Sequence, residues 1–223
     1  MLYSGPRRTP MSSKRKPKSD HRPHRIPTQA RARATFDAIV DATEQLLAKH
    51  GYAAITTNHV ADTAGVAIGS LYEYFPDKDA IVAQVARRTV QRILEEIAAA
   101  FLRLDPSDPP AALAAWVHAM FVAVGSRREL VRVLSREVPF LWDLEEIRAL
   151  PEQMIALAKV TRLPGGAEPP PAVNVEAATF LLTVMVSQAV IASAVDRPAS
   201  IPEEDVERAL TQMLTTLVLA RAT

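Results

Sequence analysis

The sequence predicts an all-helical protein, with a three-helix helix-turn-helix domain near the N-terminus and a larger C-terminal helical domain. Apolar side chains recur at three- and four-residue spacing over most of the 223 residues. Gly and Pro separate these segments at helix-like intervals. Aromatic residues make up only 5% of the chain, whereas Ala, Leu, Glu and Arg are plentiful, which favours helices over sheets.

The first 30 residues differ from the rest in composition. Residues 1–33 hold ten Lys and Arg side chains and a single acid, Asp20, although the whole chain has a net charge of only +1. Residues 1–30 also hold five prolines and few apolar side chains, so we expect a disordered basic arm. Such an arm suits contact with a polyanion such as DNA, or is a solubilising tail.

Helical periodicity begins after this arm. The first helix is expected at residues 31–50, where Gly51 ends it. Two short helices are expected at 57–64 and 68–74, and Pro76 prevents the second from continuing.

A long fourth helix follows, capped by Asp77 and apolar at steps of four up to Phe101. Later helices are expected at residues 110–125, 127–138, 140–162, 172–195 and 203–221. We therefore divide the chain into an arm (1–30), a helix-turn-helix domain (31–78) and a helical ligand-binding and dimerisation domain (79–223).

Residues 56–81 carry the clearest functional pattern. Thr56 or Thr57 caps a short helix, and Gly65 supplies the left-handed conformation needed for a tight turn into a second short helix. Two short helices joined in this way form a helix-turn-helix, whose second helix enters the major groove of DNA. The alternative is a packed helical hairpin without a ligand. Gly69 argues against it, because glycine inside a helix costs about 1 kcal/mol.

The second short helix has side chains suited to DNA. Ile68, Gly69 and Ser70 are small or modest in size, so the backbone can approach base edges closely. The hydroxyls of Tyr72 and Tyr74 can reach phosphate oxygens. Lys78 begins the next helix, where its charge and the helix N-terminus both favour an anion.

This segment resembles the TetR family of transcriptional regulators over about residues 31–82, a quarter of the chain. The matching residues are Phe36 through Leu46, Gly51-Tyr52, Ile55-Thr56-Thr57, Val60-Ala61, Ala64-Gly65-Val66, Gly69, Leu71-Tyr72, Tyr74-Phe75 and Lys78-Asp79. Beyond residue 82 the chain is similar to the family only in its helical pattern and its length.

The resemblance implies a homodimeric repressor that binds a pseudo-palindromic double-stranded DNA operator and is released by a small-molecule effector. It gives Thr57, Tyr72 and Lys78 the role of phosphate contacts. It makes Ile68, Gly69 and Ser70 the candidate readers of base edges. Ala67 departs from the family pattern, in which a Ser or Thr often caps this helix.

The C-terminal helices suggest a dimer and a ligand site. Residues 172–195 are apolar nearly all round and, with 203–221, are the expected homodimer interface; the alternative is a central core helix of a monomer. Bulky side chains of the middle helices could line an effector pocket, although composition favours ordinary core packing for each of them. These candidates are Trp116, Met120, Phe121, Phe140, Trp142 and Met154.

Other functions have little support in the sequence. The chain has no Cys, which excludes disulfides and thiolate metal sites, and it carries no recognisable catalytic or nucleotide-binding motif. We therefore expect no catalysis, no cofactor, no metal, no signal peptide and no membrane span, and a cytoplasmic location. An alternative is a helical adaptor whose basic arm binds RNA or an anionic membrane, although the arm lacks an apolar face.

Overall fold

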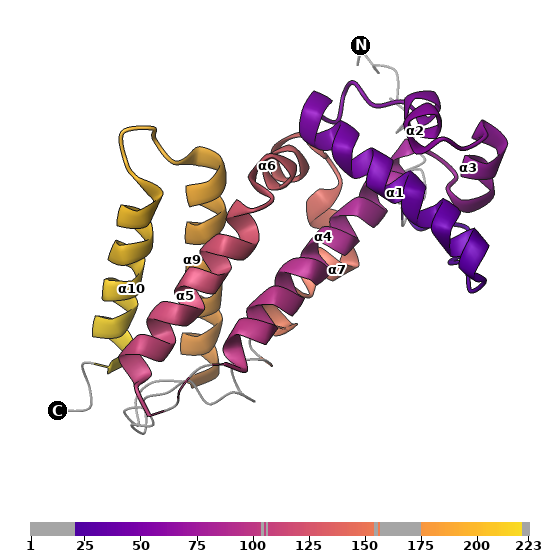
Figure 1. Cartoon of the computed structure of the whole chain (residues 1–223). Helices are drawn as coiled ribbons and strands as arrows, with labels where there is room; N and C mark the ends of the chain where they lie inside the picture. The colour runs from indigo at the N-terminus through magenta and orange to yellow at the C-terminus, as the bar shows by residue number, and fades with distance from the viewer. Residues whose placement is uncertain (1–20, 104, 106, 154–155, 157–174, 220–223) are drawn as a thin grey trace, which may run out of the picture.

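The computed structural model describes residues 21–103, 105, 107–153, 156 and 175–219, and the regular structure of these residues is entirely helical. Figure 1 shows a cluster of three helices joined by the long helix α4 to a second group of helices. The elements are α1 (Ala30–His50), α2 (Thr57–Ala64), α3 (Ile68–Tyr74), α4 (Lys78–Phe101), α5 (Pro109–Gly125), α6 (Arg128–Glu137), the 3₁₀ turn η1 (Leu141–Asp143), α7 (Glu145–Arg148), α9 (Val175–Asp196) and α10 (Glu203–Leu219). The predicted fold class is confirmed.

Helix α4 takes part in two hydrophobic cores. Its N-terminal half packs Ile81, Val82 and Val85 into a core shared with α1, α2, α3, α6 and η1. Its C-terminal half contributes Ile97 to a second core built with α5, α9 and α10. The helix-turn-helix cluster therefore rests on elements of the C-terminal domain as well as on its own helices.

Side-chain caps fix where two long helices begin. The Asp77 carboxylate accepts a hydrogen bond from the Ala80 amide at 2.8 Å, which confirms the expected cap of α4. Asp108 accepts from the Ala111 amide at 3.1 Å and begins α5, which has prolines in its first turn. Each carboxylate satisfies an amide that has no partner within its helix.

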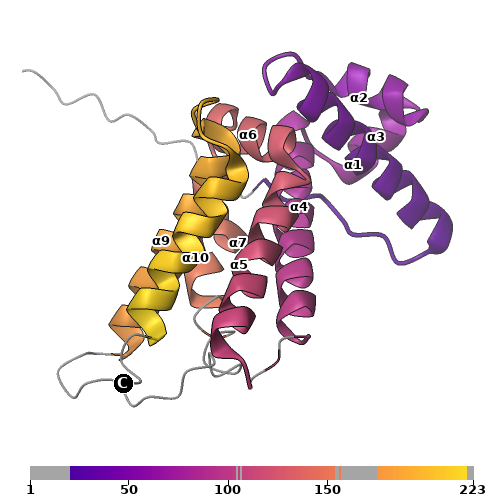
Figure 2. The ribbon, with the colours of Figure 1, turned by 60° about the vertical axis from the view of Figure 1, so that its left-hand side comes forward.

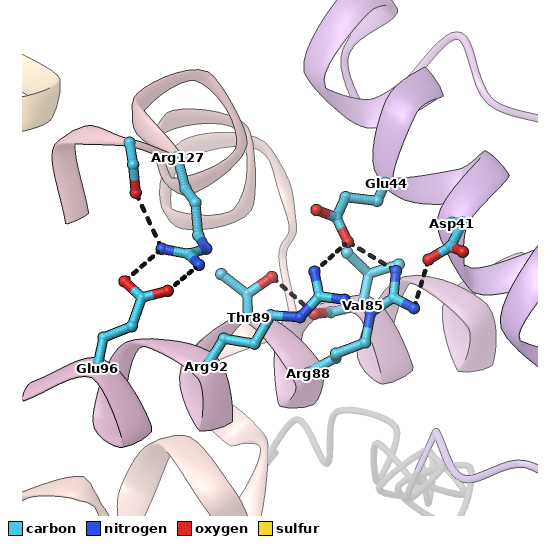
Figure 3. Close-up of polar contacts among 9 residues, drawn as sticks. Asp41, Glu44, Val85, Arg88, Thr89, Arg92, Glu96 and Arg127 are labelled. Carbon is cyan, nitrogen blue, oxygen red and sulfur yellow. Dashed lines mark hydrogen bonds and ion pairs between the residues drawn. The ribbon is translucent and has the colours of Figure 1, made fainter. Parts of the chain in front are cut away.

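Ion pairs hold α4 against its neighbours along its length (Figure 3). Arg88 contacts both Asp41 and Glu44 of α1 at 2.6 Å, and its side chain is only 17% exposed. Further along α4, Glu96 pairs with Arg127 at the corner between α5 and α6. The hydrogen bond from Arg127 lowers the pKa of Glu96, so this carboxylate is ionised at neutral pH.

The expected continuous helix over residues 140–162 is wrong in its first part. The chain forms the turn η1, then an extended residue at Leu144 (φ −62°, ψ 133°), and then the short helix α7. Leu141 and Leu144 are both buried, because the tight 3₁₀ geometry directs residues three apart to the same side. Residues 154–155 and 157–162 lie outside the described residues.

The expectation of a disordered arm fails for residues 21–29. This segment lies against the helices, Pro27 is buried, and the His24 amide donates to the Tyr74 carbonyl at 2.7 Å. Residues 1–20 of the predicted arm lie outside the described part of the chain, as do 172–174 and 220–221 of the predicted C-terminal helices. Across the described residues, no helix combines the length and apolar character needed to cross a membrane.

We predict that Arg88→Met lowers the free energy of unfolding by about 1–3 kcal/mol, because two carboxylates of α1 lose a charged hydrogen-bond donor in a partly buried place. Urea unfolding followed by circular dichroism measures this loss. The matched control is Arg208→Met, whose side chain is 71% exposed beside Asp205; we expect a change below about 0.5 kcal/mol. Equal losses in the two variants would contradict the role of Arg88.

Candidate nucleic-acid interface and ligand cavity

The turn between α2 and α3 has the geometry that the sequence predicts. Helix α2 begins after Thr56, whose hydroxyl accepts from the His59 amide at 3.2 Å. It ends at Gly65, which has the left-handed angles φ 67° and ψ 32°. The buried side chains of Val60 and Leu71 hold the two helices on the first core. Burial of one face leaves the other face of α3 at the surface.

The exposed face of α3 presents few bulky groups. Ile68 is 39% exposed, and Gly69 is exposed and would meet no atom within 4 Å if it carried a Cβ. Space therefore does not require glycine at position 69. Ala67 precedes α3 and provides no side-chain cap for the first amides of this helix, as its departure from the family pattern implies.

Two predicted phosphate contacts lie together. The hydroxyls of Thr57 at the start of α2 and Tyr72 in α3 are 3.0 Å apart, and Tyr72 is 46% exposed. Each hydroxyl can donate and accept, so the pair can orient itself toward an incoming acceptor. These two side chains, 15 positions apart in the sequence, form one polar group at the surface.

Tyr74 differs from its predicted role. It is only 4% exposed, and its ring meets Phe36 edge-on with centroids 5.8 Å apart. Helical residues two apart point in nearly opposite directions, so Tyr72 and Tyr74 cannot share a face. Tyr74 belongs with Leu71 and Phe75 on the buried side.

Lys78 lies against Tyr52 in the α1–α2 turn. Its ammonium donates to the Tyr52 carbonyl at 3.2 Å and sits 4.0 Å from the centre of the Tyr52 ring. The Tyr52 hydroxyl in turn donates to Asp79 at 2.6 Å. Burial raises the pKa of the Tyr52 hydroxyl most, and the hydrogen bond to Asp79 raises it further. The phenol therefore remains a donor at neutral pH.

Glu137 is a residue of this region that the sequence analysis missed. Its carboxylate, at the end of α6, accepts from the Tyr52 amide at 2.9 Å and lies close to Gly51, which has φ 75°. A Cβ at Gly51 would stand 2.6 Å from a Glu137 oxygen. An acidic residue at the end of an amphipathic helix carries no sequence signal of such a contact. Glu137 joins α6 of the C-terminal domain to the turn that leads into α2.

A cavity of about 380 Å³ lies among α4, α5, α6, η1, α7 and α9. Its walls are mainly apolar side chains, including Val90, Ile93, Leu134, Ile147 and Ile191. The hydroxyls of Thr89 and Ser187 also border it, but they donate to carbonyls of their own helices, Val85 and Thr183, at 2.8 and 2.7 Å. The cavity is therefore suited to an apolar guest, with polar contacts available at Arg148 and Gln188.

The predicted pocket residues divide into three groups. Met120 and Trp142 line the cavity. Phe121 and Trp116 pack in or against the second core, and Phe140 packs between Tyr52 and His21 in the first, so these three are not among its lining residues. Met154 lies outside the described residues.

Helices α9 and α10 lie side by side at the edge of the structure (Figures 1 and 2). They expose several large apolar side chains, each between 45% and 67% accessible: Phe180, Leu181, Met185 and Met213. Exposed apolar groups gathered on neighbouring helices are typical of a surface that another protein covers.

The short capped helix, the left-handed glycine turn and the exposed second helix define a helix-turn-helix, a motif that DNA-binding proteins use. Residues 39–85 match the family described as "Bacterial regulatory proteins, tetR family". The helix-turn-helix segment of this chain belongs to this family.

Comparison with individual proteins agrees with this assignment. The chain is 44% identical over 55 residues to the HTH-type transcriptional repressor KstR of Rhodococcus jostii, covering 25% of this chain and 26% of that protein. It is 30% identical over 117 residues to the repressor KstR2 of the same organism, covering 51% of this chain and 55% of that protein. The chain thus spans about a quarter to about half the length of these curated relatives.

Similarity in fold extends over more of the chain. The fatty acid degradation regulator FadR from Bacillus halodurans superposes with a TM-score of 0.62 at 18% identity, covering 85% of this chain and 96% of that one. A TetR-like regulator from Rhodococcus sp. RHA1 superposes with a TM-score of 0.56 at 22% identity, covering 86% and 97%. At these identities the likeness concerns the fold alone.

We predict opposite effects of alanine at the two glycines of the helix-turn-helix. Gly65→Ala should lower the free energy of unfolding by about 1–2 kcal/mol, because an L-residue is strained at φ 67°. Gly69→Ala should raise it by up to about 1 kcal/mol, because the site is helical and open. Urea midpoints of the two variants measure both changes. A loss of stability in Gly69→Ala would show that glycine is needed there for the fold.

Proposed function

We propose that this protein is a sequence-specific transcriptional repressor that binds a pseudo-palindromic operator as a homodimer and is released by a small-molecule effector. The single observation that carries the proposal is the exposed face of α3, with an open Gly69 and the paired hydroxyls of Thr57 and Tyr72. The match to the tetR family falls on this same segment, which favours a regulator over an RNA- or membrane-binding adaptor. Chromosomal DNA as target implies action in the cytoplasm.

The exposed groups suggest two kinds of contact. Thr57 and Tyr72 would bind one phosphate between them, and Lys78 would add a charge from the next helix, because its ammonium has N–H donors beyond the one given to Tyr52. Ile68, Gly69 and Ser70 would face base edges in the major groove. Tyr74, being buried, has no part in this interface.

The apolar surface of α9 and α10 supports the dimer. Burying Phe180, Leu181, Met185 and Met213 against a two-fold copy would remove large apolar side chains from water. A two-fold axis beside these helices would also present two α3 helices to the two half-sites of a palindrome.

The cavity supports an apolar effector. Helix α4 carries Val90 and Ile93 in the cavity wall, while Lys78 and Asp79 in its first turn contact Tyr52 of the DNA-binding cluster. A guest that displaces α4 would therefore move the cluster as well, because a hydrogen-bonded helix moves as a unit.

We predict that Tyr72→Phe weakens binding to all DNA sequences by about tenfold, because one hydrogen bond to a charged phosphate is worth roughly 1.5 kcal/mol and phosphates carry no base code. Selection from randomised duplexes, followed by fluorescence anisotropy at two salt concentrations, gives the operator and the affinities.

The control is Tyr74→Phe, which removes a hydroxyl from a buried tyrosine of the same helix and should leave affinity within about twofold. Substitution of Ser70 should alter base preference instead. Similar losses for both tyrosine variants, or salt-sensitive binding without an enriched palindrome, would refute the proposed interface.

We predict that Ile93→Trp fills part of the cavity and lowers binding of the apolar anionic probe 1-anilinonaphthalene-8-sulfonate by about tenfold, while operator binding persists. Probe fluorescence and anisotropy measure the two properties on one sample. Leu102→Trp adds the same indole at an 85% exposed site at the end of α4 and serves as the control. Unchanged probe affinity in Ile93→Trp would show that this cavity is not the ligand site.

A further inference from the structure

Residues 21–27, here called the strap, contact the C-terminal end of α3. The His24 amide donates to the Tyr74 carbonyl at 2.7 Å, and this carbonyl is one that helix geometry leaves without a partner. The Arg25 guanidinium lies 5.2 Å from the centre of the Tyr74 ring and pairs with Glu73 at 3.2 Å. Pro27 is buried beside the start of α1.

The other end of the strap contacts the C-terminal domain. The His21 ring stacks on Phe140, with centroids 4.0 Å apart and an interplanar angle of 19°. Arg87 of α4 donates to the His21 carbonyl at 3.0 Å, and Arg22 pairs with Glu145 at 2.8 Å. Figure 2 shows this segment as the indigo trace that runs from the start of α1 back toward α4.

The backbone of His21 indicates that this end is held in place. His21 has φ 48°, a left-handed conformation that residues with a side chain seldom adopt. Such a conformation persists where surrounding contacts determine it. Here the ring and the carbonyl of His21 are both engaged, and Arg87 is itself fixed by Glu146 at 2.8 Å with a side chain that is only 15% exposed.

The residues that hold the strap belong to the same short segment that lines the cavity. Phe140, Glu145 and Glu146 contact the strap or its partner Arg87. Their neighbours Leu141, Trp142, Ile147 and Arg148 line the cavity. The η1–α7 segment thus has the cavity on one side and the strap on the other, and a guest that moves η1–α7 must also move the strap.

We propose that the strap is a second connection, besides α4, through which the state of the cavity controls the recognition helix α3. Helix α3 has only 7 residues and no side-chain cap at its start. A helix this short is unstable alone, so its position depends on the contacts made to it. The consequence for DNA binding rests on the proposed function, but the connection itself belongs to the free protein.

The test is a two-by-two comparison in the full-length protein by hydrogen–deuterium exchange of peptides that span residues 68–75. One change, Ile147→Ala, loosens the cavity wall at α7. The other, His21→Gly with Arg22→Gln, releases the strap from η1–α7; glycine tolerates the φ of residue 21 while removing the stacked ring. His24→Ala is the matched control, because the His24 contact with α3 is made by its amide.

We expect Ile147→Ala to raise the exchange rate of α3 amides about fivefold when the strap is intact, and by less than about twofold when it is released. In a His24→Ala background, Ile147→Ala should raise the exchange rate as much as it does when the strap is intact. Should Ile147→Ala prove too unstable, Ile147→Val gives the same comparison with a smaller change.

An equal effect of Ile147→Ala in the intact and released proteins, or none in either, would overturn the proposal. Since DNA is absent from this experiment, its outcome is independent of the proposed function. If the exchange rates differ as expected and selection finds no operator, the proposed function is refuted, but the connection through the strap is supported.

Discussion

The structure depends on one helix having to satisfy two hydrophobic cores at once. Helix α4 is 24 residues long and packs its N-terminal half under the helix-turn-helix cluster and its C-terminal half among α5, α9 and α10. Close-packed cores resist continuous deformation, so a shift of α4 in one core imposes a shift in the other. The ion pairs of Arg88 with α1 and of Glu96 with Arg127 keep the helix in register with both neighbours (Figure 3).

Helix α3 lacks several features that stabilise a helix. Helix α3 has a glycine at position 69 that packing does not require, begins without a side-chain cap, and leaves Ile68 and Tyr72 open to solvent. Each of these departs from what a stable helix prefers. Departures of this kind gather at functional surfaces, and they lie on the side of α3 turned away from α1. The buried side, with Leu71 and Phe75, follows the ordinary rules of a core.

The boundary between the two parts of the molecule is polar and specific. The Tyr52 amide donates to Glu137 at the end of α6. The Tyr52 hydroxyl donates to Asp79, and the Tyr52 carbonyl accepts from Lys78, so this one residue contacts both α6 and the first two residues of α4. On another side, Phe140 meets both Tyr52 and His21. Partly buried hydrogen bonds and ring contacts have directional requirements, so they fix the position of one part relative to the other. A purely apolar junction would allow the two parts to shift against each other.

The sequence by itself determined most of the helices, the capped turn of the helix-turn-helix and the resemblance of this segment to the tetR family. These depend on local signals, namely apolar spacing, the caps at Thr56 and Asp77, and a glycine that turns the chain. The prediction that the hydroxyls of Tyr72 and Tyr74 both reach phosphate was wrong for Tyr74, because side chains two apart on a helix point to different sides. In the structure Tyr74 is buried with Leu71 and Phe75, and Tyr72 is exposed.

Only the tertiary structure decided the contacts between distant segments. Three contacts of this kind are the hydrogen bond between Thr57 and Tyr72, the one between Glu137 and Tyr52, and the stacking of His21 on Phe140. In each case the local sequence around one residue does not indicate its partner. The same holds for the break at Leu144, where burial of two leucines outweighed a pattern that suits a continuous helix. Periodicity indicates which face of a helix is apolar. Which element covers that face depends on how all the helices pack together.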